Sequence, residues 1–209
     1  MMKYDKIFVI GFSRTGTTSL HTLFKHCQLR PYHGRNWELE KYDAFSDGLC
    51  AKGERSDFEK LYEKYPKSLF ILNTRPLKKW LMSRGLHMYM RNKDGFEPEN
   101  PQTYVNWILQ RDKHYLEVLR FFQNDCRRLL VINIEKENWC SIVSKRLIQK
   151  ELPDVFKNKL NKEVLNPSGV KIIENSINQA FLQLQYSEEQ QMSLMVNNPL
   201  ILLYKNNIR

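Results

Sequence analysis

The sequence lacks the features that mark metal sites, disulfide frameworks and membrane spans. Its four cysteines are widely separated, and no two have Cys-x-x-Cys spacing: Cys27, Cys50, Cys126 and Cys140. This spacing argues against a zinc site and a disulfide framework, and it favours free thiols in a reducing compartment. No apolar run reaches the roughly 18 residues of a transmembrane helix, and the run at 7–10 is too short for the core of a signal peptide. We therefore expect a cytoplasmic protein with no membrane span and no metal.

Glycine, proline and acidic residues are also in short supply. Eight glycines and eight prolines in 209 residues exclude collagen-like and linker-like chains. Against 33 Lys and Arg there are 23 Asp and Glu, which gives a net charge of +10. This surplus favours an anionic partner, whether a nucleic acid, a membrane surface or a phosphorylated small molecule. Because no helix-turn-helix, RNA-recognition or zinc-finger pattern accompanies the charge, we expect no specific nucleic-acid binding.

Short apolar runs alternate with helical patterns along the chain. Strands are predicted at 7–10, 42–47, 68–73 and 129–134. Helices are predicted at 17–27, at 56–65 with Ser56 as cap, from Pro76 until Gly85 weakens the pattern, at 102–124 and at 138–150. Residues 87–101 read as a loop, and the chain from 151 onward is helical and polar. This alternation predicts an α/β fold with a mainly parallel central sheet flanked by helices. Its length predicts one domain over 1–209, with a core at about 6–150 and a helical C-terminal segment at 151–209.

The turn after the first predicted strand has the spacing of a phosphate-binding loop. Gly11 and Gly16 are separated by four residues, and the segment joins a buried strand to a helix. Two glycines let the backbone curl so that successive N–H groups point inward, and the helix N-terminus adds partial positive charge. A tight turn without a ligand is the alternative. The strand–loop–helix context favours the phosphate site.

A nucleotidase loop has lysine after the second glycine, but this chain has Thr17 there and carries its positive charge earlier, at Arg14. The segment from Gly11 to Leu20 resembles the 5′-phosphosulfate-binding loop of the sulfotransferases, which transfer a sulfuryl group from 3′-phosphoadenosine 5′-phosphosulfate (PAPS). Bacterial and related members often have Arg-Thr-Gly-Thr-Thr, as here. The resemblance implies a P-loop-like three-layer fold. It assigns to the 5′-phosphosulfate the residues Ser13, Arg14, Thr15, Gly16, Thr17, Thr18 and Ser19.

A second motif follows the next buried strand. Arg75 stands at its predicted end and Ser83 comes eight residues later, which resembles the family's 3′-phosphate-binding motif. Pro76 biases Arg75 toward an extended backbone, and a guanidinium and a hydroxyl can hold one phosphate from two sides. Taken alone, a surface salt bridge and a neutral helix residue would explain the two residues better, but the first loop lies upstream in the expected order and favours the phosphate motif. The family's basic C-terminal segment further implies that Lys162 contacts the nucleotide.

The resemblance also implies a mechanism. Arg14 would stabilise charge on the bridging oxygen as the product, 3′-phosphoadenosine 5′-phosphate (PAP), departs, and no metal is required. The general base is left open between Asp47 and His33, with Asp43 behind them. His33 lies in an expected loop at 31–34, and the two aspartates share a face if 42–47 is a strand. His87 is an outside candidate, and His21 reads as structural.

The expected function is therefore a PAPS-dependent sulfotransferase that acts on a hydroxyl or an amine of a small-molecule, glycan or lipid acceptor. A P-loop kinase or nucleotidase is the first alternative; Thr17 and the segment 73–75 argue against it, while Asp47 and Glu135 supply acids of the kind that magnesium needs. A non-catalytic nucleotide-binding protein is the second. The acceptor and the oligomeric state are open, and the loops at 31–50 and 86–101 are where we expect the acceptor pocket.

Overall fold

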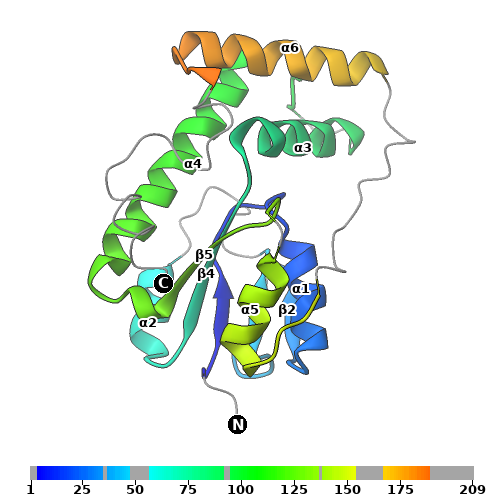
Figure 1. The fold of residues 1–209 in the computed structure, drawn as a ribbon. Coiled ribbons are helices and arrows are strands. Elements are labelled where there is room, and N and C mark those ends of the chain that lie inside the picture. The colour runs from blue at the N-terminus through cyan, green and yellow to red at the C-terminus, as the bar shows by residue number, and fades with distance from the viewer. Residues whose placement is uncertain are drawn as a thin grey trace. The chain divides into compact units, whose positions relative to one another are not determined.

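The computed structural model describes residues 4–34, 37–47, 57–91, 95–136, 138–153 and 167–188. These residues fall into two compact units. The first contains the described chain up to Thr74 and again from Phe122 to residue 153, and the second contains Arg75–Phe121 and the described residues from 167 onward. Figure 1 shows the helices and strands of both.

The first unit is built on a five-stranded sheet. Its strands are β1 (Ile7–Val9), β2 (Pro31–His33), β3 (Ala44–Ser46), β4 (Leu69–Thr74) and β5 (Leu129–Asn133). Their order is β2-β3-β1-β4-β5, and every neighbouring pair is parallel. The predicted α/β class and parallel sheet are confirmed. The carboxyl ends of all five strands therefore meet at one edge, which is where ligands bind in open parallel sheets.

Strand β2 corrects the sequence analysis, which expected a loop at 31–34. Pro31–His33 pairs with β3, and His33 lies opposite Ser46. The strand is three partly buried residues long at the edge of the sheet, so it shows no apolar run. Proline is tolerated as the first residue of an edge strand.

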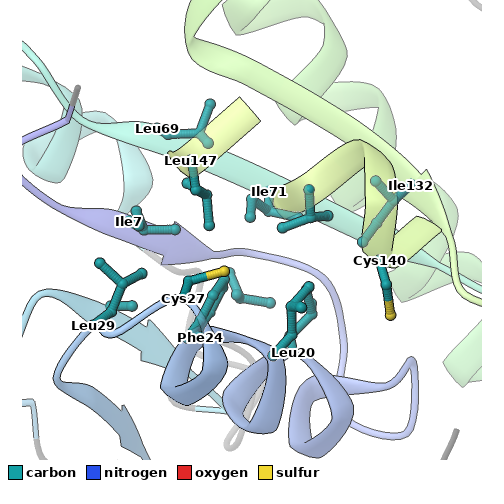
Figure 2. Close-up of a cluster of buried hydrophobic side chains, with 14 of the residues drawn as sticks. Ile7, Leu20, Phe24, Cys27, Leu29, Leu69, Ile71, Ile132, Cys140 and Leu147 are labelled. Carbon is teal, nitrogen blue, oxygen red and sulfur yellow. The ribbon is translucent and has the colours of Figure 1, made fainter. Parts of the chain in front are cut away.

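Apolar side chains cover one face of the sheet. Leu20 and Phe24 of α1 (Thr17–His26), together with Leu147 of α5 (Trp139–Ile148), belong to the same buried cluster as Ile7 and Ile71 of the sheet (Figure 2). Each such side chain contributes about 1.5–3 kcal/mol on full burial. The cluster packs α1 against the central strands, which also positions the loop that precedes α1.

Aromatic rings cover the opposite face. Phe8 stacks on Phe45 with ring centroids 5.5 Å apart, and Phe70 lies 5.0 Å from Phe122. Phe58, the first residue of α2 (Phe58–Lys64), lies 6.1 Å from Phe122. Helices on both faces of the sheet give the predicted three layers. The N-cap of α2 is Asp57, which accepts a hydrogen bond from the Lys60 N–H; the expected cap, Ser56, lies outside the described residues.

The second unit contains α3 (Leu77–Met90), α4 (Pro101–Phe121) and α6 (Pro167–Gln183), and α6 packs on both of the others. Helix α3 continues past Gly85 into the expected loop, because Gly85 is a packing position: a Cβ there would lie 2.9 Å from Cγ2 of Ile173 on α6. In the reverse direction, a Cβ on Gly169 of α6 would lie 2.5 Å from Cε1 of Tyr89 on α3. The absent side chains allow close approach of α3 and α6. Of the helices that the structure describes, none is long and apolar enough to cross a membrane.

Candidate functional site

The loop between β1 and α1 is held in shape by Asn73, a fully buried residue near the end of β4. The Gly11 N–H donates to Asn73 Oδ1 at 3.1 Å, and Asn73 Nδ2 donates to the carbonyl and the hydroxyl oxygen of Thr15 at 2.9 and 2.6 Å. A Cβ on Gly11 would lie 2.2 Å from the Asn73 carbonyl oxygen, so only glycine fits there. Asn73 therefore joins both ends of the loop, a role that sequence reasoning missed.

The backbone of the loop is suited to hold an anion. Arg14 and Gly16 have φ angles of 70° and 90°, in the left-handed region, and alternation of this kind turns successive N–H groups into one concavity. Gly16 is the N-cap of α1 and has no side chain to accept from the first-turn N–H groups. A Cβ on Gly16 would also lie 2.7 Å from Cδ1 of Ile134. The first turn of α1 contains no acidic residue of its own, so the helix N-terminus adds partial positive charge to the loop.

The side chains of the loop differ in exposure. Thr15 is fully buried, and its hydroxyl donates to the Phe12 carbonyl and accepts from Asn73. The Thr15 hydroxyl therefore stabilises the conformation of the loop. Thr18 is exposed, Ser13 and Arg14 are partly exposed, and Thr17 and Ser19 are buried in the first turn of α1.

Both leading base candidates lie beside this loop. Thr17 Oγ1 donates to Asp47 Oδ1 at 3.4 Å, and Thr18 Oγ1 lies 3.5 Å from His33 Nε2. The His33 Nε2 atom is 3.6 Å from Asp47 Oδ2, and His33 Nδ1 is 2.9 Å from the Ser46 hydroxyl oxygen. His33 and Asp47 lie at the carboxyl ends of β2 and β3, and Asp47 leaves β3 with a φ of 64°. This arrangement can accept a proton next to an anion-binding loop.

Asp43 is at the other end of β3 and has a different partner. Arg30 donates to both of its carboxylate oxygens, at 2.8 and 3.0 Å. These hydrogen bonds hold the pKa of Asp43 below its usual range despite its burial. Asp43 and Asp47 are expected to share a face if 42–47 is a strand; that condition is not met, because β3 covers only Ala44–Ser46 and both aspartates lie outside it.

His21 lies one turn into α1, with its ring centroid 5.5 Å from that of His33. Burial, followed by the charges of Lys25 and His33, lowers the pKa of His21 to about 4. His21 is therefore neutral near pH 7 and places no positive charge beside His33. Within the described ranges, no three His, Cys, Asp or Glu side chains gather so that they could hold a metal ion.

The residues of the second motif belong to the second unit. Arg75 directly precedes Pro76, the N-cap of α3, and Ser83 is buried within that helix. The Arg75 carbonyl accepts from Nη2 of Arg111 at 3.3 Å. Arg111 is fully buried, with its guanidinium 4.9 Å from the Tyr115 ring, and the sequence analysis did not single it out. His87 lies in the last turn of α3, and Lys162 falls outside the described residues.

Comparisons with known proteins give a likeness of fold. No protein-family model and no curated protein matches the chain. Among solved structures, a mouse sulfotransferase, SULT7A1, complexed with PAP is similar over 98% of this chain and 76% of its own, with 13% identity and a TM-score of 0.48. A likeness at this level assigns no activity, so the function is argued from the residues of the site.

Proposed function

We propose that the protein is a PAPS-dependent sulfotransferase that transfers a sulfuryl group to a hydroxyl or an amine and releases PAP. The observation that carries the proposal is a single cluster in the first unit. An anion-binding loop with Arg14 in place of the nucleotidase lysine adjoins a His33–Asp47 pair that contacts the hydroxyls of Thr17 and Thr18.

The loop fits a phosphosulfate by its backbone donors. Glycine at 11 and 16 lets the loop pack closely against Asn73 and Ile134, and N–H groups at the start of a helix donate to oxygens that carry negative charge. In the proposal, Ser13, Thr15 and Ser19 shape and line this cradle, while Thr17 and Thr18 add hydroxyl donors. PAPS supplies the sulfuryl group and the leaving phosphate.

Arg14 and the His33–Asp47 pair have separate roles in the proposed reaction. Negative charge develops on the oxygen between phosphorus and sulfur, and the Arg14 guanidinium stabilises it as a fixed cation. His33 and Asp47 take the proton that the acceptor oxygen or nitrogen loses as its lone pair forms the new bond to sulfur.

The second motif completes the proposal. In this proposal Arg75 and Ser83 bind the 3′-phosphate, Lys162 adds a further cation, and residues 1–209 form a single sulfotransferase-like domain. The acceptor is a small molecule, a glycan or a lipid, and the proposed compartment is the cytoplasm.

A thermal-shift assay on the full chain tests the proposal. PAP in the presence of EDTA should stabilise the protein, by about 2.7 kcal/mol at 100 times its dissociation constant, whereas ATP with magnesium should have little effect. Stabilisation that EDTA abolishes, or that only ATP with magnesium produces, favours a kinase or nucleotidase. Stabilisation by PAP without transfer from sulfur-labelled PAPS to any acceptor in a panel of alcohols, amines and sugars favours a non-catalytic binding protein.

A further inference from the structure

Ser46 contacts the Nδ1 side of the His33 ring. It is the last residue of β3, it is fully buried, and it lies opposite His33 in the register of β2 and β3. Its hydroxyl oxygen is 2.9 Å from His33 Nδ1 and 3.4 Å from the carbonyl oxygen of Tyr32. Ser46 belongs to neither of the two sequence motifs.

The hydrogens at Ser46 can be assigned by counting. A hydroxyl has one hydrogen, and a carbonyl oxygen can only accept. Both contacts of Ser46 can therefore be hydrogen bonds at once only if its O–H donates to Tyr32 and its oxygen accepts from Nδ1–H of His33. A neutral imidazole carries a single N–H, so Nε2 of His33 retains its lone pair.

The opposite tautomer has only long contacts at Nε2. A hydrogen on Nε2 would point toward Asp47 Oδ2 at 3.6 Å or Thr18 Oγ1 at 3.5 Å, both longer than an ordinary N–H···O hydrogen bond. Nδ1 would then need the Ser46 hydrogen, and the Tyr32 carbonyl would lose that donor.

We propose that Ser46 is a positioning residue: it holds neutral His33 in the Nδ1–H tautomer, so that Nε2 is the atom that accepts the proton. This inference rests on the proposed function and selects His33 over Asp47 as the base. The acceptor oxygen or nitrogen forms its bond to sulfur as its proton moves to Nε2, and His33 becomes an imidazolium. The Asp47 carboxylate, 3.6 Å from Nε2, stabilises that cation.

Nitrogen NMR on full-length protein labelled with ¹⁵N-histidine tests the tautomer without nucleotide or acceptor. His33 is assigned with His33→Gln, and spectra are recorded where the imidazole is neutral. The wild type should show Nδ1–H as the main tautomer, and Ser46→Ala should lower its ratio to the other tautomer about fivefold or more, the factor that one net hydrogen bond gives.

Ser144→Ala is the matched control. Ser144 is also fully buried, and its hydroxyl donates to the Ser141 carbonyl and accepts from the Leu152 N–H. This variant removes a buried serine hydroxyl elsewhere in the unit, and the His33 ratio should stay as in the wild type. A wild type with mainly Nε2–H overturns the proposal, as does an equal effect of both serine variants.

The tautomer in a second variant and the kinetics of sulfuryl transfer provide two further tests. If Ser46→Ala does not fold, the His33 tautomer is measured in Asp47→Asn instead. The Nδ1–H tautomer of His33 should persist in this variant, because Ser46 sets it. Loss of the Nδ1–H tautomer in Asp47→Asn overturns the proposal. In sulfuryl transfer, Ser46→Ala should lower kcat about fivefold or more with KM for PAPS within about twofold, while Ser144→Ala changes neither. A wild type that transfers no sulfuryl group contradicts the proposed function, whereas the NMR result still decides the tautomer.

Discussion

Replacing Asn73 with alanine should be among the most damaging single changes in the first unit. Asn73 is fully buried, and its side chain makes three hydrogen bonds that connect β4 with Gly11 and Thr15. At about 1 kcal/mol each, these bonds predict a loss of about 3 kcal/mol in the free energy of unfolding. The buried Gly11 N–H would lose its acceptor, which moves the expected loss toward about 5 kcal/mol.

Urea unfolding followed by far-ultraviolet circular dichroism measures this loss, with the slope m compared between variants. The matched control is Asn133→Ala. Asn133 ends the neighbouring strand β5, is only partly buried, and accepts one hydrogen bond from the Glu135 N–H at 3.0 Å, so it should cost about 1 kcal/mol. If Asn73→Ala destabilises the protein no more than Asn133→Ala, the loop does not depend on Asn73 and the reasoning is refuted. In folded Asn73→Ala, PAP should also bind more weakly than in Asn133→Ala.

Three other changes probe separate parts of the site. Arg14→Ala should cut the rate of sulfuryl transfer by roughly 10²–10³ while PAP binding weakens modestly, because charge on the bridging oxygen grows mainly in the transition state. Arg14→Lys should restore much of the rate. Normal turnover by Arg14→Ala would exclude Arg14 as the group that stabilises the bridging oxygen. Arg75→Ala should weaken PAP binding by about 1.5–3 kcal/mol in calorimetry and leave adenosine 5′-monophosphate unaffected; equal losses would remove Arg75 from the 3′-phosphate site. His21 has a pKa lowered from 6.5 to about 4, so the unfolded chain binds a proton there that the folded chain does not, and stability falls as the pH drops through that window. His21→Gln should make urea midpoints less dependent on pH between those values, and an unchanged slope would contradict the shift.

The central strands and the loop could be predicted because their signals are local. The apolar runs that become β1 and β4 are buried throughout, and β5 is buried at Leu129 and Ile132; strands of a parallel sheet read as continuous hydrophobic segments. The spacing of Gly11 and Gly16 likewise reports backbone geometry that few other residues permit. The sequence therefore predicted the scaffold and the position of the glycine-bounded loop between β1 and α1.

The parts that escaped prediction depend on contacts between segments distant in the chain. Strand β2 exists through its pairing with β3, and Gly85 continues a helix because Ile173 lies against it. Asn73 and Ser46 are buried polar residues whose partners are 58 and 13 positions away. No periodicity of a single segment carries such information. His33 and Asp47 could be named as candidates, but only the sheet order brings them to the same end of the fold.

Helices α3 and α6 each place a glycine against a side chain of the other helix, and this reciprocal packing constrains how the protein can evolve. Gly85 accommodates Ile173, and Gly169 accommodates Tyr89, so each helix contributes one recess and one projection. Enlarging either glycine alone creates a clash, and shrinking either partner alone creates a void, so single steps are selected against while paired steps are tolerated. Among natural relatives, these two pairs should therefore show correlated substitution: a larger residue at 85 with a smaller one at 173, and likewise at 169 and 89. That joint variation would record the contact of two helices that lie far apart in the chain.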